Sequence, residues 1–332
     1  MLQVSTPGPL PELTSPSTGD YLESWLSQVR GRVRARTYSG YAGLLRRYAI
    51  PSLGSVPLGD LHPLHLQHLY GALLEEGAGG YRDRLSASTV LNLHRVLVQS
   101  LGWAERFGLL GRSPARAARP PRPHRAEPRV VDPALASRIL HAASGTRLEL
   151  PVALALATGM RRGEILGLRW GDLSGDRSVA HVRRSLQATG AALVFEEPKT
   201  RRSRRSVALP EFLHPYLERH RADQATRRED RGDGWICSDL VIERGDGSPV
   251  NPDSMSSAWR FLVIRSGLPH VRFHDLRHAH ATLLLLAGVH PKVVSERLGH
   301  ASVGITLDIY SHVIPGMQAE AARAFDELFP QR

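Results

Sequence analysis

Cysteine, lysine and long apolar runs are scarce in this chain of 332 residues. The single cysteine, Cys237, excludes an internal disulfide and any zinc site built from several cysteines, and it agrees with a reducing compartment. The longest mostly apolar run, residues 150–160, is far shorter than the ~20 residues that a membrane-spanning helix needs. Residues 1–20 lack both the basic start and the apolar stretch of a secretory signal. We therefore expect a cytoplasmic protein.

Acidic residues are too few to balance the basic ones. The chain has 43 Lys and Arg against 32 Asp and Glu, which gives a net charge of +11 and a pI near 10.5. Only Lys199 and Lys292 are lysines. Codon bias explains most of that ratio, but it does not explain the net charge. Because guanidinium groups pair bidentately with phosphate oxygens, the excess charge indicates a polyanionic partner.

The length and the composition suggest two domains. Residues 1–17 are rich in proline, serine and threonine and predict a flexible tail. Residues 18–112 have helical periodicity: we expect helices around residues 21–29, 61–73 and 86–110, with Ser86 or Ser88 offering an N-cap oxygen. The apolar positions that we expect to face inward are Trp25, Leu26, Leu61, Leu64, Leu69, Leu73, Val90, Leu93, Leu97, Leu101 and Ala104.

Arginines gather at one edge of this helical domain. They are Arg30, Arg32, Arg34, Arg36, Arg46 and Arg47. The overall charge favours contact with a DNA backbone, although solvated helix ends give the same pattern. Residues 113–129 then combine prolines with arginines, which is typical of an extended connector. This segment could cross a phosphate backbone or could serve only as a solvated linker.

Residues 130–332 form the second predicted domain, which is mainly helical with a small antiparallel sheet. Helices are expected over 133–143, 148–157 and from 253 to the end. Three β-type segments are expected over 179–186, 192–197 and 206–209, with Lys199 in the turn between the last two.

Three basic clusters in this domain could converge. In the first, residues 158–164, Gly159 ends an apolar helix and Arg161 begins the next, where helix N-terminal amides favour anions. An ordinary loop arginine is the alternative. In the second, residues 274–280, the helical repeat of 100° per residue places His274, Arg277 and His278 on one face. Leu276, Ala279, Leu283 and Leu286 occupy the opposite face, which we expect to be buried.

The second cluster is a weak zinc motif. No glutamate lies between His274 and His278, and no third ligand is obvious nearby. The third cluster, residues 298–300, ends a helix that begins with Pro291, and Gly299 is its expected C-cap. Tyr310 follows ten residues later, beside Ile305 and Ile309, where it would ordinarily be a half-buried core residue.

Five elements occur in a fixed order: Thr-Gly-Met-Arg-Arg-Gly-Glu at 158–164, Lys199 in a turn, His-Asp-Leu-Arg at 274–277, Leu-Gly-His at 298–300 and Tyr-Ser-His at 310–312. Their order and spacing resemble the tyrosine recombinases, also called the phage integrase family. The elements span about 150 residues and follow a helical domain of fitting length, so the match is specific. The resemblance covers roughly residues 18–320, and it implies a helical core-DNA-binding domain followed by an α+β catalytic domain.

The resemblance implies that Tyr310 attacks the scissile phosphate, which gives a 3′-phosphotyrosine and frees a 5′-hydroxyl. Arg161 and Arg277 would stabilise the phosphorane, and their charges would favour the phenolate of Tyr310. His300 would donate to a non-bridging oxygen, while His274 would assist proton transfer from the tyrosine. Lys199 would protonate the departing 5′-oxygen. No cofactor and no metal are implied.

Other residues have smaller roles in this interpretation. Glu164 would orient Arg161, while His278 and His312 stay outside the catalytic set. The apolar stripe of Met317, Ala321, Ala324 and Leu328 resembles the family's C-terminal helix, which docks on a neighbouring protomer; packing in cis is the alternative. The expected partners are double-stranded DNA, a homo-tetramer on paired sites, and accessory DNA-bending or excisionase proteins.

The sequence predicts a site-specific recombinase that integrates or excises a mobile element. Residues 274–313 look closer to phage and conjugative-element integrases than to recombinases that resolve chromosome dimers, which are the alternative. The 17-residue tail is too short for an arm-site-binding domain. Three further readings stay open at this stage: a DNA-binding regulator without catalysis, a metallohydrolase using His274, His278 and His280, and a topoisomerase of the same chemistry.

Overall fold

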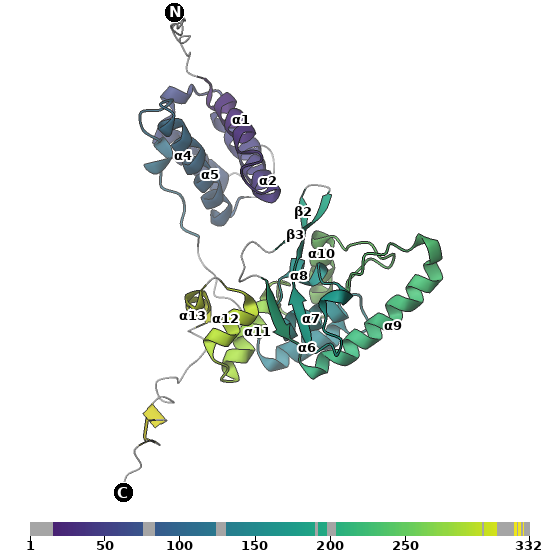
Figure 1. Cartoon of the computed structure of the whole chain (residues 1–332). Helices are drawn as coiled ribbons and strands as arrows, with labels where there is room; N and C mark the ends of the chain where they lie inside the picture. Colours follow the sequence, from purple (N-terminus) through teal and green to yellow (C-terminus); the bar gives the residue numbers. More distant parts are fainter. Residues whose placement is uncertain are drawn as a thin grey trace, which may run out of the picture. The chain divides into compact units, whose positions relative to one another are not determined.

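The computed structural model describes residues 16–75, 84–123, 131–189, 192–197, 204–300 and 302–310, together with residues 322, 323, 325, 326 and 328; for residues 308–310 it describes only the backbone. The chain divides into two compact units, residues 1–126 and 127–332. Each is described by itself. Both are dominated by helices, and the small sheets lie in the second unit (Figure 1). The predicted fold class is confirmed.

Unit 1 is built from α1 (Thr18–Val29), α2 (Ala35–Leu44), α3 (Ile50–Leu53), α4 (Pro63–Glu75) and α5 (Ala87–Arg106), with a π-helical turn, Leu45–Ala49, before α3. The Ser17 and Ser86 side chains accept backbone N–H groups of α1 and α5, which fixes the first turn of each helix. Ser86 is therefore the N-cap, as predicted. A single core buries most of the predicted apolar positions, among them Trp25, Leu26, Leu93 and Leu97. Leu64 is the exception, because it is 58% exposed and does not face inward.

The arginine edge of unit 1 is partly neutralised. Arg46 donates to both carboxylate oxygens of Glu23, at 2.8 and 2.7 Å. The hydrogen bond from Arg46 lowers the pKa of Glu23. Two other guanidiniums lie over aromatic rings: Arg30 is 5.9 Å from the ring centre of Tyr38, and Arg32 is 5.5 Å from that of Trp103.

The first half of the predicted connector belongs to unit 1. Residues Pro114–Arg116 form a 3₁₀ turn, and Ala115 and Ala118 are buried in the unit 1 core. The backbone N–H of Arg119 also bonds to the side chain of Gln67. The prediction of an extended strap over residues 113–129 is therefore wrong for this half, because small alanines between the prolines pack against the helices. Residues 124–130 lie outside the described part.

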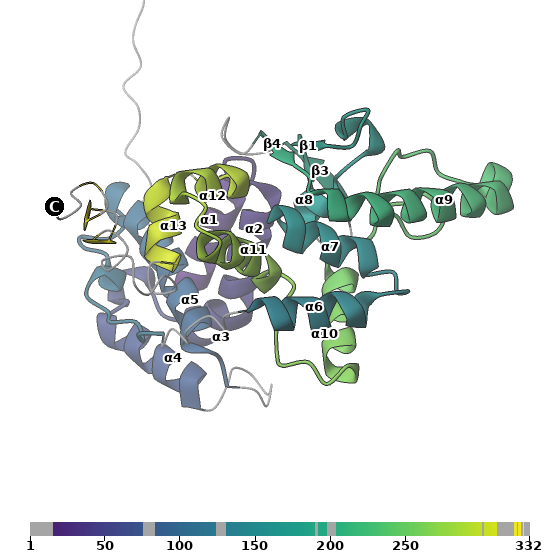
Figure 2. The same ribbon diagram turned by 90° about the horizontal axis from the view of Figure 1, so that it is seen from below.

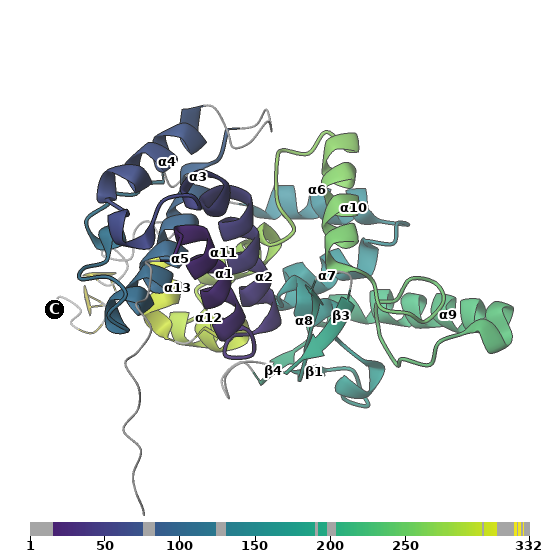
Figure 3. The same cartoon turned by 90° about the horizontal axis from the view of Figure 1, so that it is seen from above.

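Unit 2 contains α6 (Pro133–Ala143), α7 (Glu149–Thr158), α8 (Arg162–Leu166), α9 (His214–Arg231), α10 (Pro252–Arg265), α11 (Asp275–Leu286), α12 (Pro291–Leu298) and α13 (Val303–Tyr310). Every residue of α7 from Leu150 to Thr158 is buried, so this apolar helix is the centre of the unit. Helices α11, α12 and α13 lie side by side (Figure 2). The very polar α9 runs outward from them, and Leu217 is its buried residue (Figure 3).

The β-segments differ from the prediction. β1 (Val179–Val182) pairs with β4 (Arg205–Ala208), and β2 (Ser185–Thr189) pairs with β3 (Ala192–Glu196), both antiparallel. The predicted single segment 179–186 is split where Arg183 and Arg184 both turn to the buried carboxylate of Asp172. Because β3 and β4 belong to different sheets, the segment with Lys199 connects two sheets and does not close a hairpin. Among the described residues, no helix is both long and apolar enough to cross a bilayer.

Candidate active site

Arg161 stands at the N-cap of α8, as the sequence predicts. Gly159 adopts the left-handed conformation with φ of 64° and ends α7, so that the chain can turn into α8. The Arg161 backbone N–H donates to Oε2 of Glu164, and its Nη1 donates to Oε1, both at 2.8 Å. The carboxylate of Glu164 thus orients Arg161, whose side chain remains 42% exposed.

The same carboxylate binds a second guanidinium. Arg205 of β4 donates from Nη1 to Oε1 of Glu164 at 3.2 Å and from Nη2 to Oε2 at 2.9 Å. Burial alone would raise the pKa of Glu164, but the hydrogen bonds and charges of Arg205 and Arg161 lower it to about 2. Sequence reasoning missed Arg205, because it stands among the other arginines of residues 201–205 with no signal to separate it from them.

Arg277 of α11 is held by backbone carbonyls. Its side chain donates from Nη1 to the oxygen of Gly159 at 2.6 Å and from Nη2 to that of Leu298 at 2.7 Å. These carbonyls close the C-terminal ends of α7 and α12, which carry the negative end of each helix dipole. The residue is only 4% exposed, so Arg277 is buried although the helical repeat places it opposite the face that we expected to be buried.

His274 and His278 pack against each other at the start of α11. Their ring centres are 5.1 Å apart and the rings are perpendicular. Burial, together with the charges of His278 and Arg277, lowers the pKa of His274 to about 4, and burial also lowers that of His278. The His274 ring is therefore neutral at pH 7. The opposite face of α11 buries Leu276 and Ala279 as predicted, whereas Leu286 at its end is 50% exposed.

His280 is directed to a different set of partners. Its Nδ1 lies 2.8 Å from the carbonyl oxygen of Leu156, and Nε of Arg297 donates to its Nε2 at 3.4 Å. Both ring nitrogens are thus occupied by protein atoms, which argues against a zinc set of His274, His278 and His280. Within the described ranges, no group of three or more His, Cys, Asp or Glu residues is placed to hold a metal ion.

Arg297 is a second residue that sequence reasoning missed. It lies in the last turn of α12, and its Nη2 donates to the carbonyls of Ala157 and Ala208, both at 3.2 Å. It thereby ties α12 to the end of α7 and to β4. No periodicity marks such a residue, because its partners are backbone atoms far away in the sequence.

His300 follows the left-handed Gly299 that ends α12. Its Nδ1 lies 2.8 Å from Oγ1 of the fully buried Thr306 in α13. Burial lowers the pKa of His300 to about 4, and the next contributions are the charges of Arg277 and Arg161. Arg277 bonds the Leu298 carbonyl two residues before His300 and the Gly159 carbonyl two residues before Arg161, so the three residues converge.

The structure brings Arg161, His274, Arg277 and His300 into one region, but it does not describe the whole predicted set. Lys199 falls in residues 198–203, outside the described ranges. Tyr310 is the last residue of α13, one helical turn after Thr306, and its side chain is not described. In the predicted C-terminal stripe, Met317, Ala321 and Ala324 are outside the described residues, and Leu328 is 72% exposed.

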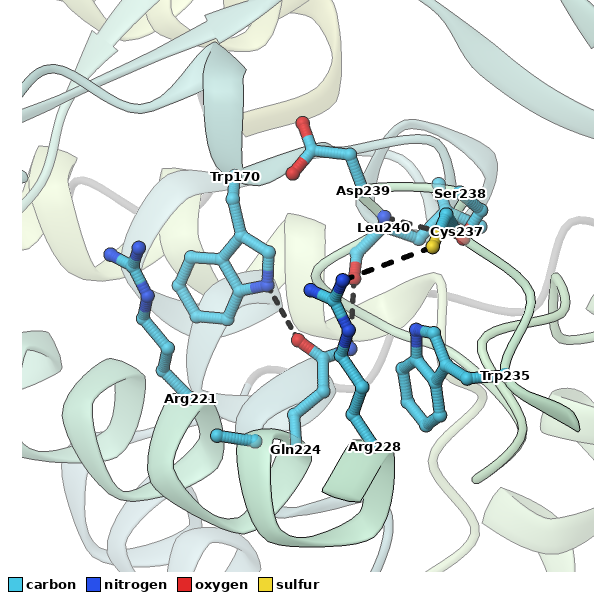
Figure 4. Close-up of a pocket in the computed structure, with 10 residues that line it drawn as sticks. Trp170, Arg221, Gln224, Arg228, Trp235, Cys237, Ser238, Asp239 and Leu240 are labelled. Atoms are coloured by element: carbon cyan, nitrogen blue, oxygen red, sulfur yellow. Dashed lines mark hydrogen bonds between the residues drawn. The ribbon is translucent and has the colours of Figure 1, made fainter. Parts of the chain in front are cut away.

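A hollow beside α9 lies apart from this region (Figure 4). The indole N–H of Trp170 donates to Oε1 of Gln224 at 2.6 Å, and Nε2 of Gln224 donates to the Leu240 carbonyl at 3.0 Å. Arg228 and Cys237 also line it, with Nη2 4.0 Å from Sγ. No described member of the predicted catalytic set lines this hollow. The Gln224 amide and the Trp170 indole are already bonded within the protein.

The described part of this region is a cluster of arginines and histidines in the second of two helical units. Residues 129–316 match the Phage integrase family, and residues 18–74 match its N-terminal SAM-like domain. The chain belongs to the phage integrase family. The predicted activity, site-specific recombination by a tyrosine recombinase, is confirmed at this level.

Relatives of known name agree with this assignment. A tyrosine recombinase XerC-like protein of Caldanaerobacter subterraneus subsp. tengcongensis is 28% identical, over 94% of this chain and 83% of its own. An integrase of Saccharopolyspora erythraea is 25% identical, over 93% of this chain and 82% of its own. The solved structure of the Tn1549 transposon integrase with transposon right end DNA has a TM-score of 0.75 at 22% identity, covering 94% of this chain and 99% of that one.

Proposed function

We propose that this recombinase integrates or excises a mobile genetic element in the cytoplasm, by cutting and rejoining duplex DNA through a 3′-phosphotyrosine. The observation that carries the proposal is the convergence of three sequence motifs on Arg277. Its guanidinium bonds the carbonyls of Gly159 and Leu298, which stand two residues before Arg161 and His300. A dianionic phosphorane needs several fixed donors around its equatorial oxygens, and guanidinium groups supply them without a metal.

In the proposed reaction, the Tyr310 oxygen forms a bond to phosphorus while the bond from phosphorus to the 5′-oxygen breaks. The phenol proton leaves toward neutral His274, which can accept it, and Lys199 gives a proton to the 5′-oxygen. Arg161 and Arg277 bind the non-bridging oxygens. The Thr306 hydroxyl can donate to Nδ1 of His300, which leaves the Nε2 proton for the phosphate. Rejoining reverses these steps, so the energy of the broken bond is conserved in the phosphotyrosine.

Double-stranded DNA and a homo-tetramer on two paired sites are the proposed partners. Strand exchange between two duplexes needs four cleavages, and each protomer carries a single Tyr310. We propose that the C-terminal segment after Tyr310 docks on a neighbouring protomer and that accessory DNA-bending or excisionase proteins set the direction. The proposed order of parts is a tail at 1–17, a core-DNA-binding domain that begins at residue 18 and takes in the first half of the predicted connector, and a catalytic domain at 130–332.

Trapping the covalent intermediate tests the catalytic proposal. With a nicked duplex from which the 5′-hydroxyl fragment diffuses away, the wild-type chain is expected to accumulate a DNA adduct, and Tyr310→Phe is expected to bind the duplex without forming one. An adduct with the Phe variant would overturn the assignment of Tyr310. Binding without any adduct by the wild type would favour a non-catalytic DNA-binding regulator.

The biological direction needs a second assay. Recombination between two marked sites on separate plasmids distinguishes a recombinase from a topoisomerase, which would relax supercoils without joining duplexes. Recombination of an element end with a chromosomal target supports the integrase, whereas exclusive action on a single repeated chromosomal site would support a dimer-resolving recombinase. Cleavage that persists in EDTA would exclude the metallohydrolase.

A further inference from the structure

The buried carboxylate of Glu164 is shared by two guanidiniums with different surroundings. Arg161 is 42% exposed, whereas the side chains of Arg205 and Glu164 are 6% and 5% exposed. Each carboxylate oxygen accepts one bond from each arginine, counting the Arg161 backbone N–H. Arg205 is therefore a buried partner of the carboxylate, and Arg161 is the member of the trio that reaches solvent.

The trio has a charge consequence for Arg161. A guanidinium that is oriented by a single carboxylate forms a neutral pair, which attracts a phosphate weakly. Two guanidiniums on one carboxylate leave a net charge of +1, and the pKa of Glu164 near 2 keeps that carboxylate ionised at neutral pH. Arg205 thus lets Glu164 orient Arg161 without cancelling the positive charge of the group.

Arg205 also reaches the end of α12 that carries His300. Its Nε donates to the Arg297 carbonyl oxygen at 2.6 Å. Gly299 packs directly on the same side chain: a Cβ there would lie 3.1 Å from Nη1 and 3.2 Å from Cδ of Arg205. The guanidinium therefore fixes both the Arg161 loop and the residues immediately before His300.

We propose that Arg205 is a positioning residue for DNA cleavage, which holds Arg161 and the His300 end of α12 in one arrangement and maintains the net positive charge beside the scissile phosphate. This inference rests on the proposed function. A lysine in its place keeps the charge, but its single ammonium cannot span both oxygens of Glu164 and the carbonyl of Arg297.

The test compares two nicked duplexes that have the same sequence and differ only at the scissile phosphate. One has an ordinary scissile phosphate, and the other has a methylphosphonate, in which a methyl group replaces a non-bridging oxygen and removes its negative charge. A residue that acts through Arg161 matters less on the uncharged substrate, because the phosphorane then carries one negative charge less. The variants are Arg205→Lys, Arg161→Ala as the reference, and Arg204→Lys, which changes an exposed arginine of the same segment.

We expect Arg205→Lys to slow adduct formation on the phosphodiester by about 30- to 100-fold, a substantial part of the loss from deleting one transition-state donor. On the methylphosphonate the loss is expected to shrink below about fivefold, as for Arg161→Ala. The double variant with Arg161→Ala is expected to lose less than the product of the two single losses, because part of the effect of Arg205 acts through Arg161. Arg204→Lys is expected to match the wild type on both substrates.

Equal losses of Arg205→Lys on the two substrates, or no loss on either, would overturn the inference. Thermal unfolding and duplex binding are measured for every variant. If Arg205→Lys does not fold, Arg205→Gln replaces it in the same comparison, because Glu164 then keeps its two bonds from Arg161 and the group becomes neutral. Failure of the proposed function is separate: the wild type would then form no adduct on the phosphodiester.

Discussion

Arg161 and Arg277 are fixed by different kinds of acceptor. Arg161 is oriented by a carboxylate, whose charge Arg205 offsets, and Arg277 is oriented by the carbonyls of Gly159 and Leu298. A carbonyl orients a guanidinium without opposing it with a full negative charge. Both arrangements keep positive charge at the site where we propose that phosphate oxygens bind.

The imidazole of His280 makes unfolding dependent on pH. Burial lowers its pKa to about 4, although the bond to Leu156 opposes this shift, so the unfolded chain binds more protons between pH ~4 and ~6.5. The free energy of unfolding should therefore be highest above pH ~6.5 and fall as the pH is lowered toward ~4. We expect His280 to account for ~3 kcal/mol of this decrease.

Urea unfolding at several pH values between 7 and 4.5 measures how much the free energy of unfolding decreases. His280→Gln is expected to lower stability at pH 7 and to flatten the pH dependence. His141→Gln changes an exposed histidine in α6 and is expected to leave that dependence unchanged. An equal pH dependence in the wild type and His280→Gln would contradict the prediction.

At the scale of elements, the C-terminal end of α7 is where three basic side chains meet. The carbonyls of Leu156, Ala157 and Gly159 accept bonds from His280, Arg297 and Arg277. Helix ends leave their last carbonyls without partners, and here these partners come from α11 and α12. The end of α7 therefore holds α11 and α12 together through these side chains.

Gly159 has no room for a side chain at this position. A Cβ would lie 2.6 Å from Cδ2 of Leu298 and 2.7 Å from Cδ2 of His280, and φ is +64°. Gly267 is a matched control, because its φ is +60° with nothing within 4 Å. Gly267→Ala should cost ~1 kcal/mol of unfolding free energy for its backbone alone, and Gly159→Ala ~3 kcal/mol or more. Urea denaturation checks the difference, and equal losses would contradict it.

The elements that could be predicted from sequence are those with a clear period. The apolar positions of α5 and the faces of α11 follow the helical repeat, so their existence was evident, although Leu286 is exposed. α2 was not evident, because Ala35–Leu44 contains Gly40 and Gly43, which lower its helix propensity, and Ala42 is its buried residue. The break between β1 and β2 was not evident either, because it depends on ion pairs of Arg183 and Arg184 with Asp172, which lies outside both strands.

Some residues of the candidate site could be predicted from the sequence and others could not. Arg161, His274, Arg277 and His300 stand in short motifs whose spacing can be read directly, and Tyr310 and Lys199 remain predictions. Arg205 and Arg297 could not be found in the sequence, because their partners are a distant carboxylate and backbone carbonyls that only the folded chain brings together.

For the whole molecule, the charge of +11 predicts that DNA binding depends steeply on salt. With 6–10 phosphate contacts, raising the salt from 50 to 200 mM is expected to lower the affinity roughly 10³-fold or more, because the release of counterions then favours binding less. Arg30→Gln is expected to reduce the slope of log affinity against log salt by about one, if its guanidinium contacts a phosphate.

The pair Arg46 and Glu23 supplies the control. Replacing both by glutamine leaves the net charge unchanged, and because their charges already offset each other, the slope should stay as in the wild type. Affinity is measured by fluorescence anisotropy at four salt concentrations. A slope that is flat for the wild type would contradict a phosphate-dominated interface.

Cys237, exposed in the hollow beside α9, is the sole thiol of the chain. A maleimide dye can therefore attach at one position in each protomer, without any prior mutation of competing cysteines. The number of bleaching steps from a single assembled complex would then equal the number of protomers in it, so one chemically unique sulfur atom makes the stoichiometry on paired sites directly countable.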